Sequence, residues 1–227
     1  MEGKKSIKSL LRTINSEIRR RGMYIPKMNA MTDREEMVAF MKQFSFATII
    51  TAKENFPVAT HLPFLVAVRD DKIILTSHFA KANEQWKAIV ENKVLVIFTE
   101  PHAYISPRNY DKELNVPTWN YISIHAYGQG RLITQTDKVI EILEATISNY
   151  ELAYMQQWNS LPGDFKLKMI KGIVAFEIEV TELQAKKKLS QNKTEAEQRR
   201  IINSLSNSNN DNEKHIADYM RRNLDVR

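Results

Sequence analysis

The chain contains no cysteine among its 227 residues. This absence excludes disulfide frameworks, thiolate nucleophiles, iron–sulfur clusters and Cys-type zinc sites. No apolar run reaches the ~18 residues of a membrane helix, and the basic N-terminus lacks the apolar core and cleavage site of a secretory signal. With 43% apolar residues the chain can nevertheless bury a sizeable core. We therefore expect a soluble, cytoplasmic protein with no membrane partner.

Positive charge is scarce in the body of the chain, although the net charge is +6. Residues 1–22 carry +5 and residues 183–205 carry +4, whereas residues 23–182 carry −3. Binding of DNA by positive charge spread over the whole body of the protein is therefore disfavoured. We interpret residues 1–22 as an extension that is not native, because Met23 and the residues after it would make a natural start for the protein. The alternative is that residues 1–22 form a short basic amphipathic helix.

Short β-rich runs dominate the middle of the chain. The turn signals at 53–55 and 69–71 are short enough for antiparallel hairpins, which favours a meander or barrel over a parallel sheet. The predicted strands cover residues 46–51, 57–68, 72–77, 94–104, 122–133 and 173–183.

Helices are predicted between and after these strands. A capping box over 32–35 begins a helix that runs to about Gln43, with apolar residues at i, i+3, i+4 and i+7. Residues 206–212 form a polar linker, and residues 213–227 form an amphipathic helix that docks on the barrel, on a second subunit, or on nothing. Residues 23–205 are the main domain. The other predicted helices cover 80–92, 136–158, 162–171 and 194–205.

The run AKKKLSQN at residues 185–192 crowds three lysines, a hydroxyl and two amides onto the end of a strand-like segment. Lysine supplies point charge, while Ser190 and Gln191 supply neutral donors, so the run suits an oxyanion. The alternative is a solvated basic turn. The run by itself favours the solvated turn over a site at Lys188, Ser190 and Gln191, and we expect Lys186 and Lys187 to be solvated.

A second polar cluster lies where a predicted strand ends and a helix starts, over residues 75–86. Unpaired N–H groups at a helix N-terminus favour an anion, and Thr76, Ser77, Lys81 and Asn83 add donors. Simple helix capping is the alternative.

Aromatic residues mark a third cluster, in which Trp119 and Tyr121 flank Asn120. Such rings can stack on a planar ligand while the amide binds its polar edge, although core packing is equally compatible with the pattern.

The five histidines show no spacing typical of metal ligands, so no metal site is predicted. Ser77 and His78 are neighbours, and neighbours in a strand point to opposite faces. No nucleophile–base pair is therefore predicted.

Seven motifs follow one another along the chain: 23–27 (MYIPK), 60–63 (THLP), 78–86 (HFAKANEQW), 103–107 (AYISP), 116–121 (VPTWNY), 125–128 (HAYG) and 188–192 (KLSQN). In this order they resemble the PaiB-like family of FMN-binding negative transcriptional regulators. The resemblance runs from Met23 to about Leu205. It implies a mainly β (α+β) fold, a six-stranded antiparallel split β-barrel with peripheral helices. It also implies FMN as cofactor, a homodimer with flavin at the subunit interface, and a repressor linked to sporulation and degradative-enzyme genes.

The wider split-barrel fold, which includes pyridoxamine-phosphate oxidases and flavin reductases, implies roles for the site residues. The phosphate is expected at the strand-to-helix junction, where Lys81 stands in place of the family's arginine. The residues implied to bind the cofactor are Thr76, Ser77, His78, Lys81 and Asn83 at the junction, His61 and Trp119-Asn120-Tyr121 at the ring, and Lys188, Ser190 and Gln191 closing the site from the same or the partner subunit.

Three functions follow from these patterns. The leading hypothesis is a dimeric FMN-binding regulator in which flavin is a ligand or redox sensor. The first alternative is a flavin-dependent reductase or oxidase, because the fold hosts both. The second is a direct DNA-binding repressor acting through residues 186–200 and the terminal helices, although no helix-turn-helix motif is recognisable.

Overall fold

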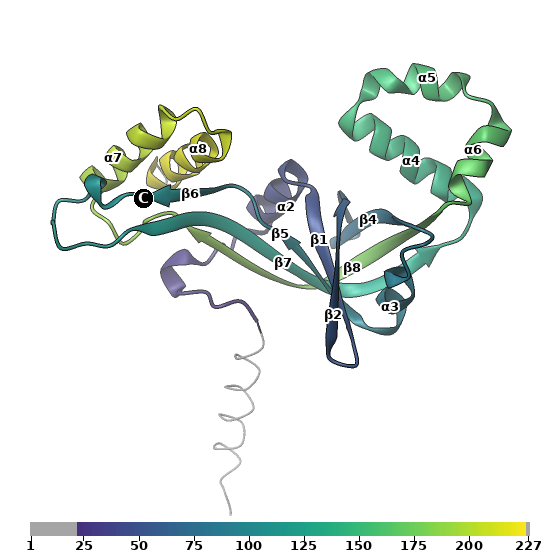
Figure 1. The fold of residues 1–227 in the computed structure, drawn as a ribbon, viewed down its shortest axis with the longest axis horizontal. Coiled ribbons are helices and arrows are strands. Elements are labelled where there is room, and N and C mark those ends of the chain that lie inside the picture. The colour runs from purple at the N-terminus through teal and green to yellow at the C-terminus, as the bar shows by residue number, and fades with distance from the viewer. Residues whose placement is uncertain (1–21, 226–227) are drawn as a thin grey trace, which may run out of the picture.

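The computed structural model describes residues 22–225, so the predicted extension lies outside the described residues except for Gly22. Within this range eight strands form one antiparallel sheet in the order β2-β1-β5-β7-β8-β4-β3, with β6 paired to β7 (Figure 1). The strands are β1 (Phe46–Lys53), β2 (Phe56–Pro63), β3 (Leu65–Arg69), β4 (Lys72–Ala80), β5 (Lys93–Phe98), β6 (His102–Ile105), β7 (Thr118–Ile133) and β8 (Ile173–Lys188).

The sheet curls because two strands that follow each other in the chain lie at its opposite edges. The chain leaves β2 and enters β3 through Phe64, which is fully buried and whose backbone N–H donates to the Ser45 carbonyl oxygen at 2.9 Å. Ser77 on β4 adds a side-chain hydrogen bond to the Pro63 carbonyl oxygen of β2 at 2.7 Å. No ladder joins β2 to β3 in the described part of the chain, so the barrel is split. The expected antiparallel split-barrel fold class is confirmed.

Strands β7 and β8 form a long ribbon that crosses the whole molecule (Figure 1). Their pairing runs from Tyr121 opposite Lys188 to Ile133 opposite Ala175, with an irregularity after Tyr127. Glycine is needed at 128, because a Cβ there would lie 2.3 Å from the Glu179 carbonyl oxygen. The ribbon therefore fixes what lies at each end of the fold.

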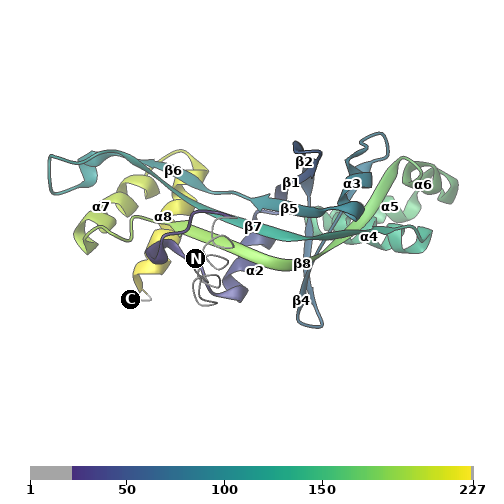
Figure 2. The same ribbon diagram turned by 90° about the horizontal axis from the view of Figure 1, so that it is seen from below.

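Helices cover the two ends of this ribbon. Figure 2 shows α2, α7 and α8 gathered on one side of strands β5, β6 and β7. Helices α4, α5 and α6 form a separate arm at the other end (Figure 1). The α-helices are α2 (Arg34–Gln43), α3 (Gln85–Glu91), α4 (Thr136–Tyr150), α5 (Met155–Ser160), α6 (Gly163–Ile170), α7 (Glu195–Ser206) and α8 (Asp211–Asp225), with short 3-10 turns η1 (Lys27–Asn29), η2 (Pro107–Asn109) and η3 (Leu152–Tyr154).

Two predicted strands are each divided into two. The run 57–68 is interrupted at Phe64, which turns into the core between β2 and β3. The run 94–104 is interrupted before β6, where Pro101 cannot donate a ladder hydrogen bond. The predicted count of six strands is therefore wrong, because apolar content continues across the break at Phe64 and the predicted run over 94–104 ignored Pro101.

The predicted helices are mostly confirmed. The predicted helix over 80–92 is confirmed only from Gln85 to Glu91, because β4 continues to Ala80, and three further corrections apply. The first helix ends at Gln43 as predicted, but its N-cap is Asp33, whose carboxylate accepts from the backbone N–H groups of the next turn. The predicted helix over 136–158 is broken at Glu151, whose φ of −152° is not helical. The predicted linker is shorter than 206–212, because α8 begins at Asp211.

No helix within residues 22–225 is both long enough and apolar enough to cross a membrane.

Candidate functional site

The predicted site residues fall into two groups that are separated along the β7–β8 ribbon, with His61 nearer the middle because Thr48 and Ile97 connect it in register to His125. His78 lies opposite Ala175, which in turn pairs with Ile133, whereas Tyr121 pairs with Lys188. The twelve-residue offset along β7 corresponds to about 40 Å of extended strand. The junction cluster is His61, Thr76, Ser77, His78, Lys81 and Asn83, and the ribbon-end cluster is Trp119, Asn120, Tyr121, Lys188, Ser190 and Gln191.

A hydrogen-bond network fastens the junction cluster to the edge of the barrel. The Asn83 side-chain amide donates to the Thr60 hydroxyl at 2.9 Å, and this hydroxyl donates to Gln85 Oε1 at 2.6 Å. Gln85 Nε2 donates to the carbonyl oxygens of Ile49 at 3.2 Å and Val58 at 3.0 Å. The network ties β1, β2 and the start of α3 together. Sequence reasoning missed Thr60 and Gln85, because a buried polar side chain inside a helical pattern has no local signal.

Successive residues of β4 point to opposite faces of the sheet. The buried Ser77 side chain points inward and binds the Pro63 carbonyl oxygen. Thr76 is buried on the outer face, beneath α4, and His78 has the same parity. Burial lowers the pKa of His78. Thr76 and Ser77 therefore do not converge on one ligand atom.

Lys81 follows β4 and is exposed. Its backbone is held on both sides, since its N–H donates to the Gly172 carbonyl oxygen at 2.8 Å and its own carbonyl accepts from Trp86 Nε1 at 3.2 Å. The first amides of α3 already have acceptors within the chain, because the Gln85 N–H donates to Asn83 Oδ1 at 3.1 Å. An anion at this junction would therefore be bound by the Lys81 side chain more than by the helix terminus.

His61 lies on the outer face of the barrel edge. Its ring stacks on Phe46 with centroids 6.4 Å apart, and both side chains are exposed. This pair is the aromatic surface next to the junction cluster.

At the other end of the ribbon Asn120 is fully buried. Its Oδ1 accepts from the Ser190 hydroxyl at 3.0 Å, and its Nδ2 donates to the Met220 sulfur at 3.4 Å. Asn120 and Ser190 therefore join β7 to the turn after β8 and to α8. The neighbouring Trp119 ring is exposed, and the exposed Tyr104 ring lies 5.9 Å away.

The expectation that Lys186 and Lys187 are solvated is wrong. Lys186 is buried, donates to the Tyr24 carbonyl oxygen at 3.1 Å, and lies 5.2 Å from the ring centroid of Tyr121. Lys187 forms an ion pair with Glu36 at 2.8 Å. Both lysines anchor the N-terminal segment and α2 against β8.

Lys188 and Gln191 end the same strand. Lys188 Nζ donates to the Trp119 carbonyl oxygen at 2.8 Å and to the Thr118 hydroxyl, and burial lowers its pKa. Gln191 accepts from the Leu189 N–H at 2.7 Å and donates to the Lys187 carbonyl oxygen at 2.6 Å. Lys188 is thus held beside the exposed Trp119 ring.

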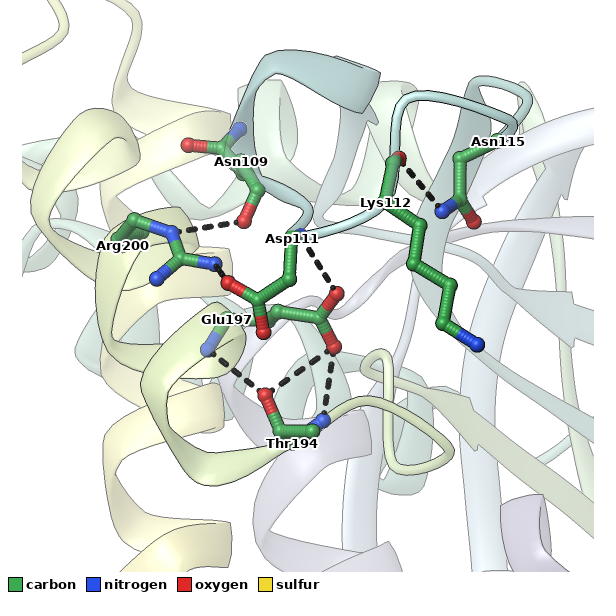
Figure 3. A network of polar contacts seen from close by, with 7 residues as sticks. All are labelled: Asn109, Asp111, Lys112, Asn115, Thr194, Glu197 and Arg200. Atoms are coloured by element: carbon green, nitrogen blue, oxygen red, sulfur yellow. Dashed lines mark hydrogen bonds and ion pairs between the residues drawn. The ribbon is translucent and has the colours of Figure 1, made fainter.

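A polar network fixes the loop between β6 and β7 on α7 (Figure 3). Arg200 Nε donates to the Asn109 carbonyl oxygen at 2.9 Å, and its guanidinium pairs with Asp111. The Asp111 N–H donates to Glu197, which also closes a capping box with Thr194. The loop is therefore held rigidly next to the ribbon-end cluster.

The outer face of β1, β5 and β7 is uncovered between the two clusters. Strand alternation places Ile50, Leu95, Ile97 and His125 on this outer sheet face, and all four are half-buried. His125 Nδ1 is buried without a hydrogen-bond partner among the described residues, and burial lowers the pKa of this histidine. An apolar face of this kind is typical of an interaction surface.

No group of three or more His, Asp and Glu side chains between residues 22 and 225 is placed to hold a metal ion.

These features define a flavin-type split barrel, and the comparisons agree. Residues 23–182 match the family described as "Putative FMN-binding domain", and the chain belongs to this family.

Among curated proteins, the chain is 40% identical over 201 residues to "Protease synthase and sporulation protein PAI 2" of Bacillus subtilis, which covers 87% of this chain and 96% of the relative. It is 27% identical over 242 residues to "Uncharacterized protein AN0679" of Emericella nidulans, with 88% and 96% covered.

Two solved structures share the fold. The flavocytochrome Anf3 from Azotobacter vinelandii has a TM-score of 0.59 at 16% identity, covering 74% of this chain and 73% of that chain. The FAD and heme binding protein from Mycobacterium smegmatis has a TM-score of 0.56 at 16% identity, covering 70% and 73%. At this identity the likeness shows the fold alone.

Proposed function

We propose that this chain is a homodimeric FMN-binding protein of the negative-regulator type. Each flavin would lie between the junction cluster of one protomer and the ribbon-end cluster of its partner. The family supports the ligand, and the sporulation protein of Bacillus subtilis supports the regulatory class.

The separation of the two clusters is the observation that carries the shared site. Within one chain the register places His78, at the end of β4, about 40 Å along the ribbon from Tyr121, so this end of the junction cluster cannot contact the same ligand as the ribbon-end cluster. A two-fold axis in the plane of an interface on the uncovered outer sheet face, perpendicular to β7, would turn the partner's ribbon end for end. The junction cluster of each protomer would then face the ribbon-end cluster of the other.

The residues present fit FMN. Exposed Lys81 supplies a positive charge for the phosphate, although lysine lacks the bidentate fork of arginine. His61 and Phe46 offer one aromatic surface, and the partner's Trp119 offers a second. Bound flavin would supply electron transfer, while these side chains bind it and exclude water from the ring.

Regulation through flavin occupancy is favoured over direct DNA contact. Two arginines of the terminal helices form ion pairs within the chain: Arg199 with Glu195 at 2.7 Å on α7, and Arg221 with Asp218 at 2.6 Å on α8. Paired arginines leave little free charge for phosphates of DNA. Flavin would therefore control the dimer or a partner protein rather than a DNA-reading surface.

A mixed dimer tests the shared site. Lys81→Gln disables the junction cluster and Trp119→Ala disables the ribbon-end cluster, so each homodimer should bind FMN at least about tenfold more weakly. In a shared-site dimer of one chain of each kind, one site carries both defects and the other carries neither. We expect one FMN per differently tagged mixed dimer, measured by flavin absorbance after purification through both tags.

A mixed dimer without flavin would show that each site lies within one protomer. An unchanged protein that binds no FMN in titration calorimetry would refute the flavin assignment. Lys112→Gln, on the exposed loop, is the matched control and should leave FMN binding unchanged.

A further inference from the structure

A groove of about 1070 Å³ lies between α4 and the outer faces of β3, β4, β7 and β8. Its volume is that of a pocket for a small organic ligand. The groove is separate from the exposed Lys81 and from the ribbon-end cluster, and of the predicted site residues it includes only Thr76.

The helix that roofs the groove meets the sheet at β3 and leaves space over the rest of the outer face. Ile142, Ala145 and Asn149 recur at i, i+3 and i+7 and therefore share the face of α4 that lines the groove. Ala145 is too small and Asn149 too polar to fill the space, whereas the floor is apolar and half-exposed at Leu65 and Ile133. The space between α4 and the sheet can therefore bind the apolar part of a ligand.

One end of the groove carries two arginines held by a single buried acid. Glu177 is 8% exposed, and its two oxygens accept from Arg69 at 2.6 Å and from Arg131 at 2.7 Å. Burial raises the pKa of Glu177, but the two guanidinium partners outweigh burial and hold it below its usual range. The carboxylate is therefore ionised and fixes both arginines in place.

The arginine pair is not fully neutralised. Two guanidinium groups share one carboxylate, and the side chains of Arg69 and Arg131 remain 56% and 78% exposed. Among the other charged lining residues, Lys138 pairs with Glu141 at 2.9 Å, and Asp137 lies in the first turn of α4. A ligand anion bound between Arg69 and Arg131 would give the two guanidinium groups a second negative partner beside Glu177.

We infer that this groove binds a small amphipathic carboxylate. Its carboxylate lies between Arg69 and Arg131, and its hydrocarbon part lies on Leu65 and Ile133 under Ala145. The inference does not rest on the flavin proposal, because neither arginine belongs to the two clusters.

Calorimetric titration of the full chain with octanoate, octanol and acetate tests both halves of the groove. We expect octanoate to bind at least tenfold more tightly than octanol, which lacks the charge, and than acetate, which lacks the chain. Arg131→Gln should weaken octanoate binding at least tenfold, whereas the matched control Arg199→Gln on α7 should not.

Ala145→Trp supplies a second variant that leaves the Arg69–Glu177–Arg131 cluster intact. It fills the apolar part of the groove and should abolish octanoate binding while the circular dichroism spectrum and FMN binding stay unchanged. Failure of octanoate to bind, or binding unaffected by either variant, would overturn the inference. Displacement of octanoate by FMN would also overturn it, because the groove would then belong to the flavin site.

Discussion

Gln85 shows how one side chain can define a site without touching a ligand. It is buried at the start of α3 and holds backbone carbonyl groups of both β1 and β2. Its Oε1 also accepts the Thr60 hydroxyl, which in turn binds Asn83. The position of Asn83 in the junction cluster therefore depends on Gln85.

Replacing Gln85 with leucine should destabilise the fold by about 2–3 kcal/mol. Leucine keeps the volume but leaves the Ile49 and Val58 carbonyl oxygens without their side-chain donor. Urea unfolding at neutral pH measures the change, with Gln156→Leu, exposed on α5, as the control. Equal stability of the two variants would mean that the buried network contributes nothing.

At the scale of elements, α8 is part of the main core and not a free tail. Ile216, Ala217 and Met220 are buried in the same cluster as the sheet, and Tyr219 donates to Gln43 Oε1 at 3.1 Å. Of the three alternatives left by the sequence, docking on the barrel within the same chain is confirmed. Because the connection between α7 and α8 is short, α8 docks next to α7 in the same chain.

Ile216→Ala should cost about 2–5 kcal/mol of folding free energy, because Ile216 is fully buried and the lost methyl groups leave a cavity. A single thermal transition at lower temperature is expected, since α8 shares the core with the barrel. Val90→Ala, exposed on α3, is the control. Two separate transitions in scanning calorimetry would instead make α8 an independent unit.

At the scale of the whole molecule, the uncovered outer sheet face has no evident role in a monomer. Phe46 is 67% exposed at one side of this face, next to half-buried Ile50 and Ile97. The helices α2, α7 and α8 pack on the opposite side of the β5–β7 strands (Figure 2). Association through the outer face would bury it and bring the two clusters together.

Phe46→Ser should raise the dimer dissociation constant about tenfold or more, because one exposed aromatic ring is lost from each side of the interface. Sedimentation velocity across a concentration series measures it. Phe165→Ser makes the same substitution on α6, where the side chain is 44% exposed, and should leave the dimer dissociation constant unchanged. A shift of the same size in both variants would place the interface elsewhere.

The sequence by itself determined the kinds and order of the elements, because these depend on local patterns. Alternation of apolar residues and short turns predicted the antiparallel sheet, and the motifs from Met23 onward predicted the FMN-binding family. The first helix ended at Gln43 as its periodicity required. Local patterns also predicted continuous elements across Phe64 and Glu151. At both residues the backbone changes direction although the composition of the chain does not change.

Only the tertiary structure decided how the predicted site residues are grouped. The β7–β8 register placed Lys188 beside Trp119 and some 40 Å along the ribbon from His78, and strand parity turned Thr76 and Ser77 to opposite faces. Lys186 looked solvated in the sequence, but Tyr24 and Tyr121 bury it. These outcomes depend on pairings between residues far apart in the chain, which no local pattern encodes.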